Sequence, residues 1–183
     1  QASMKKNIYV IIAVITVSLI ALVGYLVLSP KSPKDVATYS GNGIEIKVEY
    51  SRPYKKGRII FGEVKDQPLL SYGQYWRLGA NASTDITFSK SVLFGGKEVS
   101  AGTYRMYAVP GDDSFQISLN AEPGVSSAHN EPEYSKDVAK VDVPVQASEE
   151  TEQLTIAFTD SSAEVNMDIK WDRVVLRVPI LPQ

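Results

Sequence analysis

The sequence IEIKVEY occupies residues 44–50, and in it every second residue is apolar while the residues between are charged. This period of two is typical of a β-strand with one face in the core and the other in water. A similar alternation recurs at 104–108, 115–119, 154–158, 165–171 and 174–180. Turns rich in Gly, Pro, Asp and Ser separate these stretches. Sheets with one apolar face pack against each other, so the sequence predicts an all-β domain, an antiparallel β-sandwich with Greek-key or jelly-roll connections.

Residues 8–28 form an uncharged, mostly apolar run that follows Lys5 and Lys6. A helix of this length would reach roughly 30 Å, which is the thickness of the hydrocarbon core of a membrane. The run therefore predicts one N-terminal transmembrane helix ahead of the β-sandwich, with the membrane as a partner. A cleaved secretory signal is the alternative. Such signals have an apolar stretch of about 7–15 residues and a small-residue cleavage site, which the sequence around Leu28 lacks.

Composition divides the chain into four parts. Residues 1–7 combine Gln1-Ala2-Ser3, which look like a remnant of cloning, with a short cytoplasmic N-terminus. Residues 8–28 are the predicted anchor, residues 29–39 a linker of Pro, Ser and Lys, and residues 40–183 the β domain. A signal-anchor ahead of one long domain most often exports that domain, so we expect the domain to lie outside the cytoplasm.

The charge of the chain argues against a nucleic-acid partner. It carries 19 Lys and Arg against 21 Asp and Glu, and Lys5, Lys6, Lys31 and Lys34 all precede the first acidic residue, Asp35. The remainder is net acidic, whereas a nucleic-acid site needs a basic face. With no cysteine in the chain, thiol catalysis and disulfides are excluded. We expect neither a metal nor a cofactor.

A dense set of unusual motifs begins at Ser51-Arg52-Pro53 and continues past Phe88. Its members are Gly57-Arg58, Phe61-Gly62, Tyr72-Gly73, Trp76-Arg77, Gly79-Ala80-Asn81 and Ala101-Gly102-Thr103-Tyr104. In this order and at these separations they closely resemble a bacterial family known as domain of unknown function 2911, and the resemblance reaches about Ile180. It implies an exported, often membrane- or envelope-associated β domain with no established activity. The expected location is thus a bacterial membrane, single-pass, with the domain in the periplasm or cell envelope.

The chain departs from the family pattern at two points. Leu78 and Ala82 stand where members commonly have Thr and Glu around the Gly-Ala-Asn motif. The loop after Asn120 usually carries a Trp-Gly pair in the family, and here it has no tryptophan. The sequence therefore argues against a function in this chain that depends on that carboxylate.

The candidate binding residues are Arg58, Trp76, Arg77, Asn81 and Asp85. A planar guanidinium beside an indole and an amide can hold a carboxylate, a phosphate or a sugar at the mouth of a sandwich. The same residues also suit a structural role, in which Arg77 pairs with Asp85 or with loop carbonyls and Trp76 fills the core. Both interpretations stay open on the sequence.

No residue is assigned a catalytic role. His129 is the only histidine and lies in a polar loop, where a solvated side chain is expected, and a Ser-His-Asp arrangement would have to include it. The sequence therefore favours a non-catalytic binding or assembly module of the bacterial envelope that contacts an envelope protein, a peptide or a glycan. The alternative is an envelope hydrolase or small-ligand-binding protein with a site around the loop 76–81.

Overall fold

The computed structural model describes residues 2–28, 31–161 and 164–183. The chain divides into two compact units, Gln1–Lys31 and Ser32–Gln183. The first unit contains helix α1 (Ala2–Leu28), on which apolar side chains such as Ile12, Leu19 and Val23 are more than half exposed. In the part of the chain that the structure describes, no helix is both long and apolar enough to cross a membrane. The predicted transmembrane helix is not supported by that finding.

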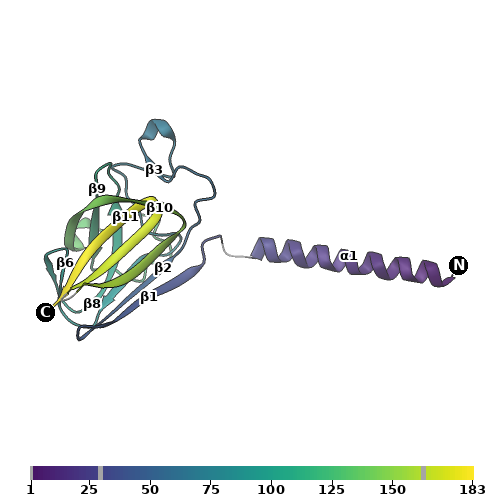
Figure 1. Cartoon of the computed structure of the whole chain (residues 1–183), viewed down its shortest axis with the longest axis horizontal. Helices are drawn as coiled ribbons and strands as arrows, with labels where there is room; N and C mark the ends of the chain where they lie inside the picture. The colour runs from purple at the N-terminus through teal and green to yellow at the C-terminus, as the bar shows by residue number, and fades with distance from the viewer. Residues whose placement is uncertain (1, 29–30, 162–163) are drawn as a thin grey trace. The chain divides into compact units, whose positions relative to one another are not determined.

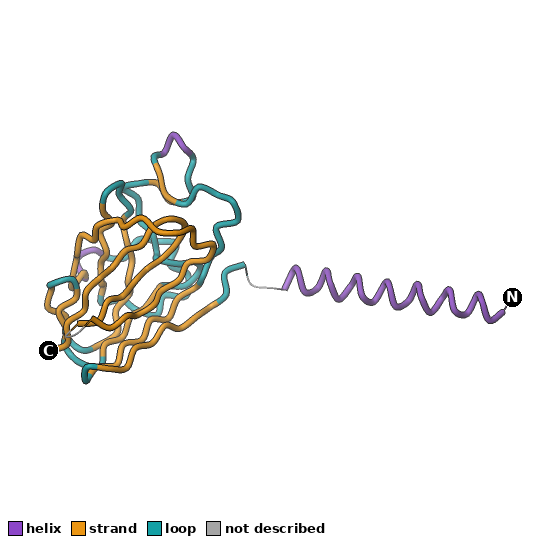
Figure 2. Tube along the Cα trace, viewed as in Figure 1, coloured by secondary structure: helices purple, strands orange, loops and turns teal. Residues whose placement is uncertain are grey.

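The second unit is built mainly of strands and the loops that connect them (Figures 1 and 2). Its strands are β1 (Lys34–Gly41), β2 (Ile44–Ser51), β3 (Phe61–Gly62), β4 (Leu70–Ser71), β5 (Thr84–Phe88), β6 (Val92–Phe94), β7 (Lys97–Val99), β8 (Gly102–Val109), β9 (Ser114–Asn120), β10 (Asp137–Ser161) and β11 (Glu164–Pro182), with 3-10 turns η1 (Val64–Asp66) and η2 (Tyr134–Lys136). Nine strands pair in the order β1-β2-β5-β8-β9-β10-β11-β6-β7, and all of these pairs are antiparallel. The short pair β3 and β4 is parallel.

The long strand β10 joins two layers. Its first part, Asp137 to Pro144, pairs with β9, and its second part, from Val145 onward, pairs with β11. The sheet thus passes from β1-β2-β5-β8-β9 into β10-β11-β6-β7, and Figure 1 shows β10 and β11 crossing the strands β2 and β8. Both layers contribute to one hydrophobic core. The predicted antiparallel, mostly β fold is confirmed.

The predicted Greek-key or jelly-roll connections stay a prediction beside the strand order that the structure shows. Most neighbouring strands in the sheet also follow each other along the chain. The main exception is the hairpin β6–β7. After β5 the chain crosses to the far edge of the sheet, forms this hairpin there, and then returns to form β8 beside β5. Alternation of side chains indicates which face of a strand is buried, but it carries no information on which strands are neighbours.

Two boundaries also differ from those expected. Within the predicted linker 29–39, the structure places the start of β1 at Lys34, and its pairing partner in β2 is Ser51; residues 29–30 lie outside the described residues. The stretches 165–171 and 174–180 belong to one strand, β11. Asp172, with a positive φ of 55°, breaks the alternation between them without ending the strand.

Four aromatic side chains fill the centre of the core. The rings of Trp76 and Trp171 stack with their centroids 6.0 Å apart, and Phe61 packs edge-on against Trp76 at 5.3 Å and Phe115 at 4.9 Å. Offset-stacked and edge-to-face geometries are the favourable ones for aromatic rings. These contacts link β11, β9 and the segment between β4 and β5, so the aromatic cluster ties both layers together.

Asp168 of β11 is a buried carboxylate held by cations. It is 1% exposed and accepts two hydrogen bonds from Arg177, from Nε at 2.7 Å and from the second guanidinium nitrogen at 2.9 Å. Lys170 lies 3.5 Å away. The hydrogen bonds to Arg177 hold the pKa of Asp168 below its usual value, although burial acts in the opposite direction. The charged form is thus the one that the fold stabilises.

We expect Asp168→Asn to lower the free energy of unfolding at pH 7 by about 1–3 kcal/mol, because charge-assisted hydrogen bonds to a buried group are lost. A depressed pKa contributes stability above the ordinary Asp value, and that contribution disappears as the pH falls through the folded-state pKa. The difference between wild type and variant should therefore narrow below about pH 4. Urea unfolding at pH 7 and at pH 3 measures it, with the exposed Asp113→Asn as control; a pH-independent difference would contradict the expectation.

Candidate functional site

The predicted candidate Trp76 belongs to the core. It is 3% exposed, its ring stacks on Trp171, and its backbone exchanges two hydrogen bonds with Ala108, at 2.7 and 2.8 Å. The indole cannot line a surface site in this position. Its neighbour Arg77 is half-buried, and in the described residues its side chain has neither a hydrogen bond nor an ion pair, with Asp85 or with any other group.

Arg58 and Asn81 hold backbone segments. Arg58 donates to the carbonyl oxygens of Tyr54 and Lys55, which lie four and three residues before it. Asn81 has a positive φ of 63°, and its carbonyl accepts a 2.8 Å hydrogen bond from the amide of Ala128. Asn residues tolerate this left-handed conformation better than most others. The five predicted residues therefore do not converge on one site.

A row of polar residues instead crosses the outer face of the sheet. Cross-strand pairing places Glu49 opposite Asp85, Asp85 opposite Arg105, and Arg105 opposite Asn120. The next strand continues the row with Asp137, which pairs with Asn120. The strand neighbours of the first four residues of the row are buried in the core: Val48, Ile86, Met106 and Leu119. Residues 105, 120 and 137 were not singled out from the sequence, because only the register brings them into line.

Residues 121–136, here called the cover segment, lie over part of this row. Arg105, 3% exposed, donates from its guanidinium to the hydroxyl of Tyr75 and, at 2.7 Å, to the carbonyl of Asn130. Asn120 is fully buried and donates at 2.9 Å to the carbonyl of Glu133. Buried polar groups of this kind are costly unless they are hydrogen-bonded. The side chains of Arg105 and Asn120 therefore hold the cover segment against the sheet by hydrogen bonds.

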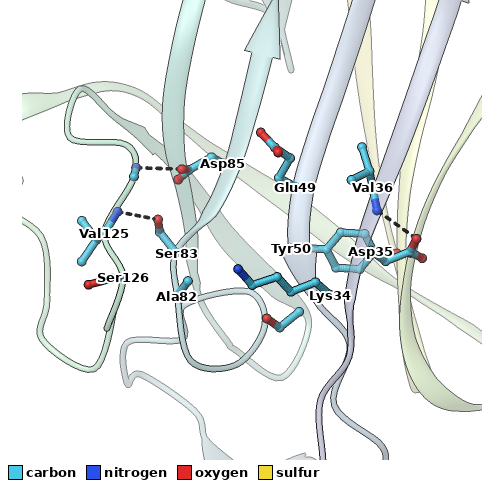
Figure 3. Close-up of a pocket in the computed structure, with 12 residues that line it drawn as sticks. Lys34, Asp35, Val36, Glu49, Tyr50, Ala82, Ser83, Asp85, Val125 and Ser126 are labelled. Carbon is cyan, nitrogen blue, oxygen red and sulfur yellow. Dashed lines mark hydrogen bonds between the residues drawn. The ribbon is translucent and has the colours of Figure 1, made fainter. Parts of the chain in front are cut away.

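The block between Tyr75 and Asp85 supplies further fastenings. The amide of Ser83 donates to the carbonyl of Val125 at 2.8 Å, and the amide of Val125 donates to Ser83 Oγ at 3.0 Å. The amide of Gly124 donates to Asp85 Oδ2 at 2.7 Å, as Figure 3 shows from the side of the groove. Tyr75 donates to the carbonyl of Ala128 at 3.2 Å. The motif-rich block thus positions a loop, in agreement with the structural interpretation of its polar residues.

Two tyrosines under and beside the cover segment are unsuited to acid-base chemistry. Tyr107 is buried and donates at 2.7 Å to Asp137 Oδ2, and burial raises its pKa well above the ordinary value. Burial and a hydrogen bond to Glu131 raise the pKa of Tyr134 to about 12. Both phenols stay neutral near pH 7, because their pKa values lie far above it. They act as hydrogen-bond donors to carboxylates and not as general bases.

Beside the cover segment a groove opens on the outer face of the sheet (Figure 3). It has a volume of about 360 Å³. Its floor comes from the ends of β1, β2 and β5, and its wall from residues 124–126; the lining residues are Lys34, Asp35, Val36, Glu49, Tyr50, Ser51, Ala82, Ser83, Asp85, Gly124, Val125 and Ser126. Asp85 is the one member of the predicted set that lines it. Its lining residues carry three carboxylates, four hydroxyls and one ammonium.

Two buried polar atoms close to the groove have no hydrogen-bond partner in the described residues. Asp85 Oδ1 and Arg105 Nε are both buried without a partner in the described part of the chain, and the two side chains form no ion pair there. Among the described residues, Glu49 forms an ion pair with Lys47 at 3.0 Å, and both of these side chains are about half exposed. An exposed pair of this kind contributes little to stability. Asp85 Oδ1 and Arg105 Nε are therefore an unpaired acceptor and an unpaired donor on neighbouring strands, both out of contact with solvent.

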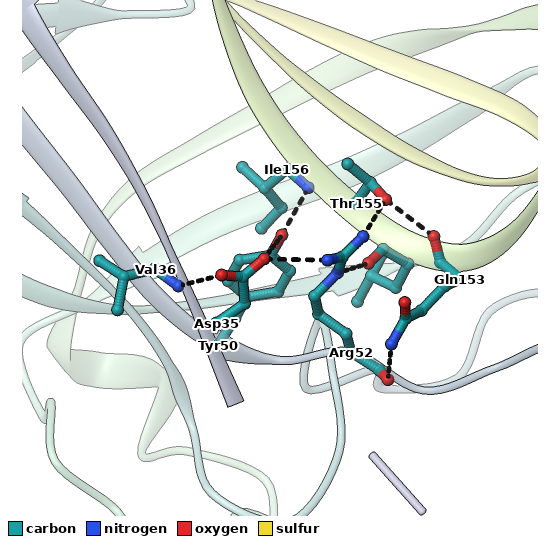
Figure 4. Close-up of polar contacts among 8 residues, drawn as sticks. Asp35, Val36, Tyr50, Arg52, Gln153, Thr155 and Ile156 are labelled. Atoms are coloured by element: carbon teal, nitrogen blue, oxygen red, sulfur yellow. Dashed lines mark hydrogen bonds and ion pairs between the residues drawn. The ribbon is translucent and has the colours of Figure 1, made fainter. Parts of the chain in front are cut away.

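A second polar cluster connects β1 and the end of β2 to β10 by hydrogen bonds (Figure 4). Arg52 donates to Asp35 at 3.1 Å, to the carbonyl of Leu154 at 2.9 Å and to Thr155 at 2.8 Å. Tyr50 accepts a 3.0 Å hydrogen bond from the amide of Ile156, and burial raises the pKa of this phenol. These contacts join the edge of β2 to the free edge of β10. The Ser51-Arg52-Pro53 motif was visible in the sequence, but its role as a fastener was not.

His129 lies on the cover segment in an exposed position. Its Nδ1 is 2.9 Å from Ser127 Oγ, and no carboxylate of the described residues joins the pair. A catalytic triad requires a third residue that orients the histidine. Within the described residues there is likewise no group of three His, Cys, Asp or Glu side chains placed to hold a metal ion.

The fold and the groove define an antiparallel β domain with a polar surface groove beside a fastened loop. The model of the family of proteins of unknown function DUF2911 matches residues 32–180, and the chain belongs to this family. No curated protein and no solved structure matches the chain.

Proposed function

We propose that the chain is a non-catalytic binding module of the bacterial envelope and that the groove beside the cover segment holds an extended polar ligand, a peptide or a glycan. The observation that carries this proposal is the groove itself, about 360 Å³ of space bordered by hydroxyls, carboxylates and backbone. Sites for small ligands and for single units of a polymer have this size and combine a few polar groups with apolar contact.

The alternative, a hydrolase or small-ligand site around the loop 76–81, is supported less well. Trp76 is buried in the core, and the backbone of Asn81 is occupied by the cover segment. Catalysis needs a base within hydrogen-bonding reach of a reacting group. In the described part of the chain, the hydrogen-bond partner of the His129 side chain is Ser127 and not a carboxylate.

Tethering to the membrane through residues 8–28 belongs to the same proposal. Its support is the sequence, since the run contains no charged residue and its length suits a hydrocarbon core. If the tether exists, alkaline carbonate should leave the full chain in the membrane pellet. Release of the intact chain into the supernatant would contradict the tether and would leave the binding proposal standing.

Filling the groove tests the binding proposal. Ser126 is exposed and lines the groove, so Ser126→Trp places a large side chain in it without entering the core. Ser127→Trp is the matched control, because Ser127 is exposed on the same segment and does not line the groove. On arrays of peptides and glycan fragments, we expect the full chain and the control to bind a shared set of probes and Ser126→Trp to lose that set. Equal binding by both variants, or no binding by the wild type, would refute the proposal.

A further inference from the structure

One short segment of the β domain exposes a group of aliphatic side chains. Ile59, Val64 and Leu69 are 54%, 67% and 44% exposed. They are three of the seven large apolar side chains that are exposed in the described part of the domain, and all three lie within a stretch of eleven residues. Single exposed apolar residues are normal, whereas a group of them marks a contact surface. Residues 56–69, here called the apolar loop, therefore form such a surface.

Hydrogen bonds give the apolar loop a defined shape. The amide of Leu69 donates to the carbonyl of Ile59 at 2.9 Å. At the base of the loop, the guanidinium of Arg58 donates to the carbonyls of Tyr54 and Lys55. Figures 1 and 2 show the loop projecting from the strands of the domain, with the turn η1 at its apex. A preorganised loop loses little conformational entropy when it binds.

The apolar loop arises at the end of the domain where β1 begins. The amide of Arg52, which follows β2, donates at 2.8 Å to the carbonyl of Pro33, which precedes β1. From Arg52 the chain continues to the start of the apolar loop at Lys56. The turn between Gly41 and Ile44 lies at the opposite end of the same two strands. The chain therefore enters the domain at the end from which the loop leaves it.

We infer that the apolar loop inserts into the surface of the lipid bilayer that holds the proposed tether, residues 8–28. This inference rests on the tether in the proposed function and gives the domain a second contact with the same membrane. Five residues, 29–33, connect the tether to β1, and five residues reach at most about 18 Å. The tether therefore keeps this end of the domain near the bilayer, so the loop binds at a high effective concentration of lipid.

The charge of the apolar loop suits an anionic lipid surface better than the charge of the whole domain does. The loop contains three basic and two acidic side chains: Lys56, Arg58, Lys65, Glu63 and Asp66. Its net charge is thus +1, whereas residues 35–183 carry 15 Lys and Arg against 21 Asp and Glu, a net charge of −6. Anionic lipids attract basic side chains and repel acidic ones. Contact through the loop therefore avoids the repulsion that other faces of the domain meet.

The composition of the apolar loop also favours lipid over a protein partner. Protein interfaces concentrate their binding energy in Trp, Tyr and Arg, whereas Leu and Val are under-represented there. The exposed apolar residues of the loop are all aliphatic, and Arg58 is engaged by backbone carbonyls. Glu63 and Asp66 lie close to Val64 in the chain, and carboxylates are costly to bury. The insertion is therefore shallow, near the level of the lipid headgroups.

The sequence contains no cysteine, so a single thiol reports on one position of the full chain. Val64→Cys places a thiol-linked fluorophore at the apex of the loop. Lys90→Cys is the control, because Lys90 is exposed and follows Phe88, which pairs with Ile46 in the half of β2 away from Arg52. The labelled chains are reconstituted into vesicles of phosphatidylethanolamine and phosphatidylglycerol. A lipid nitroxide, placed either near the headgroup or at the end of an acyl chain, quenches only a nearby fluorophore.

We expect the emission of the label at position 64 to move to shorter wavelengths and to be quenched several-fold more by the headgroup nitroxide than by the chain-end nitroxide. The label at position 90 should show neither effect. Adding Ile59→Asp to the Val64→Cys chain should abolish most of the quenching, because a carboxylate replaces an aliphatic contact. Val138→Asp is the matched control, since Val138 is also an exposed aliphatic residue, 44% accessible, but lies in β10. It should leave the quenching unchanged.

Flotation of the vesicles separates failure of the loop contact from failure of the tether. A full chain that does not float with the vesicles would refute the tether and the loop contact together. A chain that floats while the label at position 64 stays in water would refute the loop contact alone, and would assign the apolar loop to a protein partner. Equal quenching at positions 64 and 90 would also overturn the inference. Each of these results leaves the polar groove and its test by Ser126→Trp unaffected.

Discussion

Replacing Trp171 by alanine should lower the free energy of unfolding by about 3–5 kcal/mol. Trp171 is 2% exposed, stacks on Trp76 and meets Phe61 edge-on with the ring centroids 6.1 Å apart. The alanine leaves a cavity where both layers of the domain meet, and the aromatic contacts are lost with the ring. Since single domains are stable by only about 5–15 kcal/mol, the variant should melt at a much lower temperature.

Trp171→Phe is the control for this cavity. Trp171 Nε1 is buried without a hydrogen-bond partner in the described residues, so its removal sacrifices no hydrogen bond. Phenylalanine retains an aromatic ring near Trp76 and leaves a smaller space. Urea unfolding followed by circular dichroism should therefore place Trp171→Phe much closer to wild type than Trp171→Ala. If the alanine variant cost less than about 1 kcal/mol, the aromatic cluster would not be the centre of the core.

Arg105→Met should lower the free energy of unfolding by about 3 kcal/mol, because each of two hydrogen bonds from a buried charged donor contributes about 1.5 kcal/mol or more. The carbonyl of Asn130 and the hydroxyl of Tyr75 lose their donor. We expect the loss of stability to affect mainly the cover segment, residues 121–136. Amide hydrogen exchange should become faster there than in β8, where Arg105 itself lies.

Arg77→Met is the matched control for Arg105. Arg77 has the same side chain and is half-buried, but it has no hydrogen bond or ion pair in the described part of the chain. Its replacement should change stability by no more than about 0.5 kcal/mol. If Arg77→Met were as damaging as Arg105→Met, the guanidinium of Arg77 would have a structural or binding role that the present geometry does not assign to it.

The sequence motifs predicted only part of the candidate site. The motifs around Trp76 pointed to a region that organises the molecule, and Asp85 does line the groove. Trp76 itself lies in the core. The sequence did not predict this, because a tryptophan in a short extended segment is equally compatible with a core and a surface position. Glu49, which faces Asp85, was seen in the sequence only as a polar position of an alternating strand.

By itself, the sequence determined the antiparallel β character and the buried face of each strand, because the alternation at 44–50 or 115–119 depends only on neighbouring residues. It also identified the family, which the match over residues 32–180 bears out. Only the tertiary structure decided that Glu49 lies opposite Asp85, that β1 starts at Lys34, and that the cover segment buries Arg105. Register and loop position depend on contacts between residues far apart in the chain, and a local pattern carries no record of those contacts.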